Sequence, residues 1–209
     1  MAVGDIGSYE GYGFRLGQSS GVMAAGLAAN SPVFSFRNPT PAAGSAGSRR
    51  LRILQVTVNA AVGATGFTAG AGQFAMLVAR NFTAADTGGS DITPAANSLS
   101  NALRTKQNPS ILAGSTGSIR IASTAALTAG TRTLDSNPVG NINFGAPATA
   151  GSLMVADIPI YNDWTSIYGI PLVLAGQEGF VIQASVPAVG VWQFGVNVLW
   201  AELDGGQLG

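Results

Sequence analysis

Residues 191–203 read VWQFGVNVLWAEL, a run in which large apolar and small or polar side chains alternate. Successive side chains of a β-strand point to opposite faces, so strict alternation predicts a strand with one face in the core. The predicted inward face is formed by Trp192, Phe194, Val196, Val198 and Trp200, and the other face by Gln193, Gly195, Asn197 and Leu199. One apolar face beside one polar face is typical of a central antiparallel strand.

The residues before this run predict two further strands. Ile170–Leu174 (IPLVL) and Phe180–Val186 (FVIQASV) are β-branched and apolar, and the turn sequence AGQEG separates them. Pro187–Gly190 is a further turn signal before the last strand. The C-terminal quarter therefore predicts strand, turn, strand, turn, strand.

Further outward, short runs of the same character recur between segments rich in Gly, Pro and Ala. No helical periodicity of useful length interrupts them, and no internal repeat is present. About eight strands with long, uneven connections predict an all-β fold, an antiparallel β-sandwich of jelly-roll or Greek-key type. The other expected strands are Val33–Arg37, Arg50–Val58, Gln73–Phe82, Ser118–Ser123 and Gly151–Ile158, with a Gly/Ala/Thr connection at 60–72.

The chain has 209 residues, which is the size of one all-β domain. Residues 1–32 are rich in Gly and Ala and predict an extended N-terminal arm, whereas residues 33–209 predict the sandwich body. Tyr9, Tyr12 and Phe14 are the aromatic anchors that such an arm offers to neighbouring subunits.

Composition narrows the possible functions. The chain contains no His and no Cys, which excludes histidine acid–base catalysis, thiol chemistry, disulfides and zinc–cysteine sites. Ten basic and ten acidic residues give a net charge of zero, and charged residues make up only 10% of the chain. Free small domains usually keep a more charged surface to stay dispersed. The low charge indicates either a surface covered by neighbouring copies or a surface that is polar without charge.

Paired carboxylates are the remaining candidates for catalysis. Asp157, Asp163 and Glu178 are acids of the kind that hydrolyse glycosides when two of them face a sugar groove. Asp residues at strand ends more often cap turns, and Lys106 lacks the serine spacing of a Ser–Lys pair. We therefore expect no enzymatic activity and no catalytic residue.

Asp86 and Asp91 lie in a turn-rich segment and are a candidate calcium site, but the spacing of a calcium loop and a third acid are missing. We expect no metal and no cofactor. Arg49, Arg50 and Arg52 form the one basic cluster, which lacks the interleaved aromatics of a nucleic-acid site. Its place at a strand entrance favours guarding a strand edge or pairing with a neighbouring subunit. The sequence also predicts no secretory signal and no membrane span.

Three segments carry a resemblance. Ile119–Arg132 (IRIASTAALTAGTR), Pro171–Ile182 (PLVLAGQEGFVI) and Trp192–Glu202 resemble virion structural proteins of tailed bacteriophages, over roughly the C-terminal half of the chain. The resemblance implies a particle component, either a capsid decoration (cement) protein or a tail or fibre protein. It transfers no functional residue.

The resulting hypothesis is a non-enzymatic decoration protein located in the virion. Its expected partners are other copies of itself, preferably as a homotrimer, and virion proteins such as the major capsid protein, without nucleic acid or membrane. The alternative is a receptor- or carbohydrate-binding head of a tail fibre or a surface adhesin. A glycan-binding head would show a shallow cleft lined by Trp or Tyr near the Tyr161–Tyr168 loop.

Overall fold

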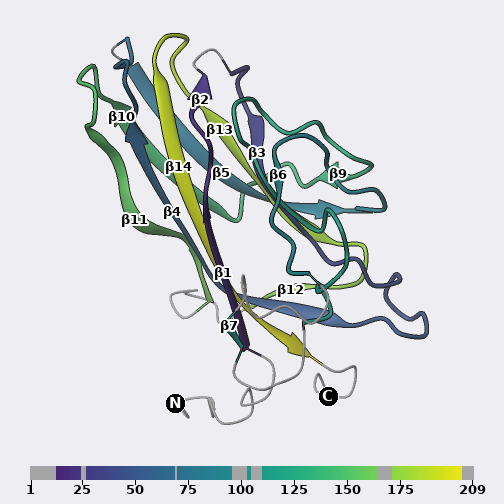
Figure 1. Cartoon of the computed structure of the whole chain (residues 1–209). Coiled ribbons are helices and arrows are strands. Elements are labelled where there is room, and N and C mark those ends of the chain that lie inside the picture. Colours follow the sequence, from purple (N-terminus) through teal and green to yellow (C-terminus); the bar gives the residue numbers. More distant parts are fainter. Residues whose placement is uncertain are drawn as a thin grey trace.

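The computed structural model describes residues 13–24, 27–68, 70–95, 110–163 and 171–203, and the backbone of residues 103 and 104. These residues form two antiparallel β-sheets packed face to face, as the sequence predicts (Figure 1). The described ranges contain no α-helix and hence no helix able to cross a membrane.

Sheet A has seven strands in the order β11-β4-β14-β1-β7, with β12 paired to β4 and β2 paired to β14. Its strands are β1 (Gly13–Ser19), β2 (Met23–Ala24), β4 (Arg50–Val62), β7 (Leu103–Arg104), β11 (Leu153–Asn162), β12 (Leu172–Leu174) and β14 (Val191–Leu203). Sheet B has the order β10-β5-β13-β3-β8-β6, with β9 paired to β5. Its strands are β3 (Ser31–Arg37), β5 (Gly70–Arg80), β6 (Ser90–Asp91), β8 (Ile119–Ile121), β9 (Thr133–Leu134), β10 (Gly140–Ala146) and β13 (Gly179–Ser185).

The eight long strands follow a jelly-roll path. Counted along the chain, the first, eighth, third and sixth (β1, β14, β4 and β11) are neighbours in sheet A. The second, seventh, fourth and fifth (β3, β13, β5 and β10) are neighbours in sheet B. This alternation between two sheets is the jelly roll, one of the two topologies that the number and spacing of strands predict.

The core lies between the sheets, and β14 contributes its largest side chains. Every residue of the predicted inward face of this strand is buried, and β14 is central in sheet A. Trp200 stacks on Phe14 with ring centroids 5.6 Å apart and meets the edge of Phe36 at 5.4 Å. Trp192 packs against Phe74 from the opposite sheet at 5.9 Å. The contacts of Trp200 with Phe36 and of Trp192 with Phe74 join the two sheets and fix how the layers pack on each other.

The other predicted strands are found with shifted ends. The strand expected at residues 50–58 continues to Val62, and β5 begins at Gly70, so the connection expected at 60–72 is shorter. β10 was not predicted, because its sequence GNINFGA has two glycines and two asparagines that indicate a loop. It forms because it pairs with β5 over seven residues.

The expectation of an extended arm at residues 1–32 is wrong for the described part of that range. β1 pairs with β14 over seven residues, and Phe14 and Leu16 are buried in the core. Phe14 therefore anchors the chain to its own core and is not available to another subunit. Tyr9 and Tyr12, the other two expected anchors, lie outside the described residues.

Candidate functional site

The three acids considered for catalysis do not converge. Asp163 is buried at the end of β11 and forms an ion pair with Arg52, with an Nη2 to Oδ2 distance of 2.5 Å. Asp157 is exposed on the same strand. Glu178 lies in the turn before β13, in the other sheet. These positions form no pair of carboxylates facing a shared groove.

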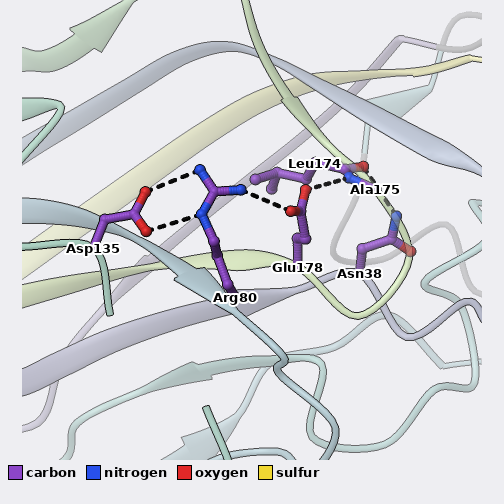
Figure 2. Close-up of polar contacts among 6 residues, drawn as sticks. All are labelled: Asn38, Arg80, Asp135, Leu174, Ala175 and Glu178. Atoms are coloured by element: carbon purple, nitrogen blue, oxygen red, sulfur yellow. Dashed lines mark hydrogen bonds and ion pairs between the residues drawn. The ribbon is translucent and has the colours of Figure 1, made fainter. Parts of the chain in front are cut away.

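Glu178 belongs to a structural cluster around Arg80 (Figure 2). Arg80 donates to both oxygens of Asp135 at 2.9 and 3.0 Å and to Oε1 of Glu178 at 3.0 Å. The hydrogen bond and charge of Asp135, followed by the charge of Glu178, raise the pKa of Arg80. Glu178 also accepts a hydrogen bond from the Ala175 amide at 2.9 Å. The cluster thus joins the end of β5 to the turn between β12 and β13.

Asp86 and Asp91 also have internal partners. Asp86 is buried, forms an ion pair with Arg132 and accepts the Gly130 amide at 2.9 Å. Asp91 accepts amides of Thr93 and Gly117. Burial opposes ionisation of Asp91, but these hydrogen bonds outweigh it and lower its pKa. Among the described residues, no group of three or more acids is placed to hold a metal ion.

The three arginines of the basic cluster, Arg49, Arg50 and Arg52, differ in their surroundings. Arg52 pairs with Asp163, whereas Arg49 and Arg50 are exposed at the start of β4. Of the Tyr161–Tyr168 loop, residues 161–163 are described. The Tyr161 hydroxyl accepts the Leu172 amide at 2.7 Å, and burial raises the pKa of this tyrosine. This ring therefore serves the fold, while Lys106, Trp164 and Tyr168 lie outside the described residues.

One further carboxylate is buried and held mainly by hydrogen bonds, with the charge of Arg49 as a weaker influence. Glu202, near the end of β14, accepts a hydrogen bond from the Ser110 hydroxyl at 2.5 Å and from the Ile111 amide at 3.0 Å. Burial raises its pKa, against the opposing effect of these hydrogen bonds. Glu202 therefore anchors the segment at 110–115 to sheet A.

A polar surface lies on the outer face of sheet A, which is the face directed away from the core. The strand register places its side chains in rows across β1, β14 and β4. One row is Arg15, Leu199 and Gln55; the next is Gly17, Asn197 and Thr57; the third is Ser19, Gly195 and Asn59. Amide and hydroxyl groups therefore dominate the middle of this face. We call these three rows, with the adjoining Gln18 and Asp157, the outer-face groove.

Two adjoining hollows make up the groove. The first has a volume of about 380 Å³, and its lining includes Arg15, Gln55, Thr57 and Asp157. The second has a volume of about 330 Å³, and its lining includes Asn59 and Gln18. Asn197 lines both hollows, so they lie next to each other on the sheet face.

Two glycines make room for the asparagine side chains of the groove. A Cβ atom at Gly17 would lie 2.1 Å from Oδ1 of Asn197, and one at Gly195 would lie 2.8 Å from Oδ1 of Asn59. Asn197 also donates from Nδ2 to the Thr57 hydroxyl at 3.2 Å. The amide of Asn197 therefore lies across the sheet face, from β4 to β1.

The alternation of β14 and β4 gave the signal for this polar face, since Gln193, Gly195 and Asn197 were expected to point away from the core. The groove itself was missed, because it depends on which strands are neighbours and in what register. The arrangement holds no nucleophile beside a base. Its side chains can donate and accept hydrogen bonds.

A second surface is distinguished by the absence of charge. The loops between β1 and β2, β4 and β5, β10 and β11, and β13 and β14 meet at one end of the sandwich. The Phe67 amide donates to the Pro147 carbonyl at 3.0 Å, and the Val191 amide donates to that of Thr65 at 2.9 Å. We call this surface the uncharged end; it comprises residues 20–24, 62–68, 146–153 and 186–191, none of which is charged.

The uncharged end also carries exposed apolar side chains. Leu153 is 63% exposed, Val189 is 55% exposed and Val22 is 51% exposed. These are three of the five large apolar side chains that the described surface leaves exposed. Exposed large apolar side chains are therefore concentrated at this end.

No protein-family model, curated protein or solved structure matches this chain.

Proposed function

We propose that this chain is a non-enzymatic structural protein of a tailed-phage virion, a capsid decoration (cement) protein that stabilises the particle through subunit contacts. The uncharged end is the observation that carries the proposal. A surface of valine, leucine, alanine and glycine without charge is costly to leave in water and favourable to cover. In this proposal, neighbouring subunits cover it.

The distribution of charge along the chain supports this use of the uncharged end. Four long runs contain no charged residue, and each run goes to the uncharged end and returns. They are residues 16–36, 53–79, 136–156 and 179–201. If this surface were only polar and exposed to water, at least some of the four runs would be expected to carry charged residues. The pattern favours a contact surface, because surfaces that face water usually carry both positive and negative residues.

Many of the charged residues away from the uncharged end are paired within the chain. Five carboxylates are within 4.0 Å of four arginines of the same chain. Charges satisfied in this way hold loops in place and offer little to a charged partner. This internal pairing of charges is consistent with contacts to neighbouring subunits through the uncharged end.

Fold and resemblance agree with the proposal without deciding it. Jelly rolls are found in viral capsid proteins and in lectin domains. Function has to come from a surface, since one fold serves many functions. The resemblance of three segments to virion proteins of tailed phages supports the viral use, with a homotrimer as the proposed assembly and the major capsid protein as the proposed support.

The experiment places a charge on the uncharged end. In Val189→Lys, a lysine buried on assembly would lose its hydration without a partner, so self-association and retention on particles should fall at least about tenfold. Association is measured by sedimentation, and retention by quantifying the protein on particles of the phage whose genome encodes it. The matched control is Val139→Lys, because Val139 is 43% exposed and precedes β10 at the strand end away from this surface.

Two results would count against the proposal. If Val189→Lys and the control bind particles equally well, the uncharged end is not the contact surface. If the unaltered protein stays monomeric at high concentration and no particle contains it, the structural role is wrong.

A further inference from the structure

We propose that the outer-face groove of sheet A binds an uncharged oligosaccharide. The inference does not rest on the virion proposal, because the groove and the uncharged end are different surfaces. It also differs from the aromatic cleft expected near Tyr161–Tyr168. The groove runs over β1, β14 and β4, which lie side by side in Figure 1.

The first argument is the chemistry of the lining. Gln55, Asn59 and Asn197 carry amides, which both donate and accept hydrogen bonds, and Thr57 carries a hydroxyl with the same capacity. The backbone N–H and C=O groups of the central strands are used in the pairing of β14 with β4 and with β1. Only side chains are therefore offered to a ligand, and they match a ligand whose own groups both donate and accept. Sugar hydroxyls have that property.

The second argument is a pair of opposite charges. Arg15 and Asp157 are exposed, line the same hollow and form no ion pair within the described part of the chain. They come from β1 and β11, which are three strand spacings apart, or about 14 Å. Hydrogen bonds from an ionised group are roughly twice as strong as neutral ones. Because the two charges cancel, the groove favours a ligand without net charge.

The third argument is the shape of the floor. Gly17 and Gly195 are the positions where a side chain would push Asn197 or Asn59 up into the groove. Because these two glycines have no side chain, the asparagine amides can lie flat against the sheet. Both hollows therefore stay open. The two neighbouring hollows, at about 380 and 330 Å³, each have the size range of small-molecule sites.

The same observations exclude other occupants. A nucleic acid requires several basic groups for its phosphates, and here one arginine faces one aspartate. A peptide added as a strand requires a free sheet edge, whereas β14 lies between β4 and β1. An apolar partner requires exposed aromatic or aliphatic anchors, and the rows of the groove offer Leu199 alone, half-buried. An oligosaccharide requires none of these three features, and its hydroxyl groups match the amides and hydroxyl of the groove.

The test uses the full chain labelled with ¹⁵N and a panel of neutral hexasaccharides of glucose, mannose, galactose and N-acetylglucosamine. Each sugar is added to about 10 mM, above the roughly millimolar Kd of a weak site. We expect at least one sugar to shift the amide signals of Gly17, Thr57 and Asn197. Gly17→Ala should weaken that binding at least about tenfold, and Asp157→Asn should weaken it several-fold.

The matched control is Gly145→Ala. Gly145 lies on β10 of the other sheet, and a Cβ atom there would have no neighbour within 4 Å. This variant should bind like the unaltered protein, and thermal unfolding verifies that all three variants are folded. The proposal is overturned if no sugar shifts these signals, if shifts lie elsewhere, or if Gly17→Ala and Gly145→Ala behave alike. It is also overturned if the groove signals change with protein concentration alone, which would assign the face to a second copy.

Discussion

At the scale of single residues, Asp86 and Arg132 form the most deeply buried of the ion pairs in the described part of the chain. Both side chains are withdrawn from solvent, and the Arg132 guanidinium also lies 5.3 Å from the centre of the Phe82 ring. Removing one member of a buried pair leaves an uncompensated charge. We expect Asp86→Ala to lower the free energy of unfolding by about 3–5 kcal/mol, measured by urea denaturation.

The double variant Asp86→Ala/Arg132→Met separates the pair from the packing around it. It should be more stable than Asp86→Ala alone, because it removes the stranded charge and keeps an apolar side chain against Phe82. A single variant that loses less than about 1 kcal/mol would show that Arg132 reaches water once its partner is gone.

Glu202 leads to a prediction about pH. Because burial raises its pKa in the folded state, folding favours the protonated form. The stability that protonation provides is present in full below the unfolded pKa of about 4.3 and is lost as the pH rises through the raised folded value. Glu202→Gln cannot ionise, so its stability relative to the unaltered protein should increase between about pH 4 and pH 8. Chemical denaturation at several pH values measures this difference, and a difference that is constant across the range would contradict the role of burial.

At the scale of elements, β1 changes what a truncation should do. An extended arm could be removed without harm to the body, but β1 lies between β14 and β7 and places Phe14 and Leu16 in the core. Deleting residues 1–24 should therefore abolish cooperative unfolding and the near-ultraviolet circular dichroism of the packed aromatics. Arg15→Gln on the outer face of the same strand is the control and should change stability by no more than about 0.5 kcal/mol. A truncated chain that still unfolds cooperatively would restore the arm interpretation.

The difference between β14 and β1 shows how far the sequence could predict this molecule. β14 is a long alternation of large apolar and polar side chains, so its strand, its buried face and the all-β class followed from local pattern. β1 alternates too, but Gly13, Gly17 and the serines after it disguise the period. Gly17 is small because Asn197 lies over it. That reason exists only after residues about 180 positions apart in the chain are paired, as the register shows.

The candidate surfaces have the same limitation. Gln55 and Thr57 lie among the polar residues of the strand predicted at 50–58, whereas Asn59 lies beyond its predicted end. That these residues lie beside Asn197 and Arg15 required the strand order. The uncharged end was present in the sequence as four runs without charge. Only the jelly-roll path shows that all four runs turn at the same end, where each run passes from a strand of one sheet to a strand of the other.

For the whole molecule, the separation of charged and uncharged halves predicts how assembly responds to salt. Contacts between charges weaken as the screening length falls from about 10 Å at 0.1 M salt to about 3 Å at 1 M. Contacts made by the uncharged end hold no charge to screen, and excluded salts such as sulfate strengthen apolar burial. We expect the self-association constant of the full chain, measured by sedimentation equilibrium, to stay within about twofold between 0.1 and 1 M NaCl and to rise in sodium sulfate. If NaCl instead weakens association several-fold, the copies meet through charged residues, and the exposed Arg49 and Arg50 at the opposite end of β4 are the first to substitute.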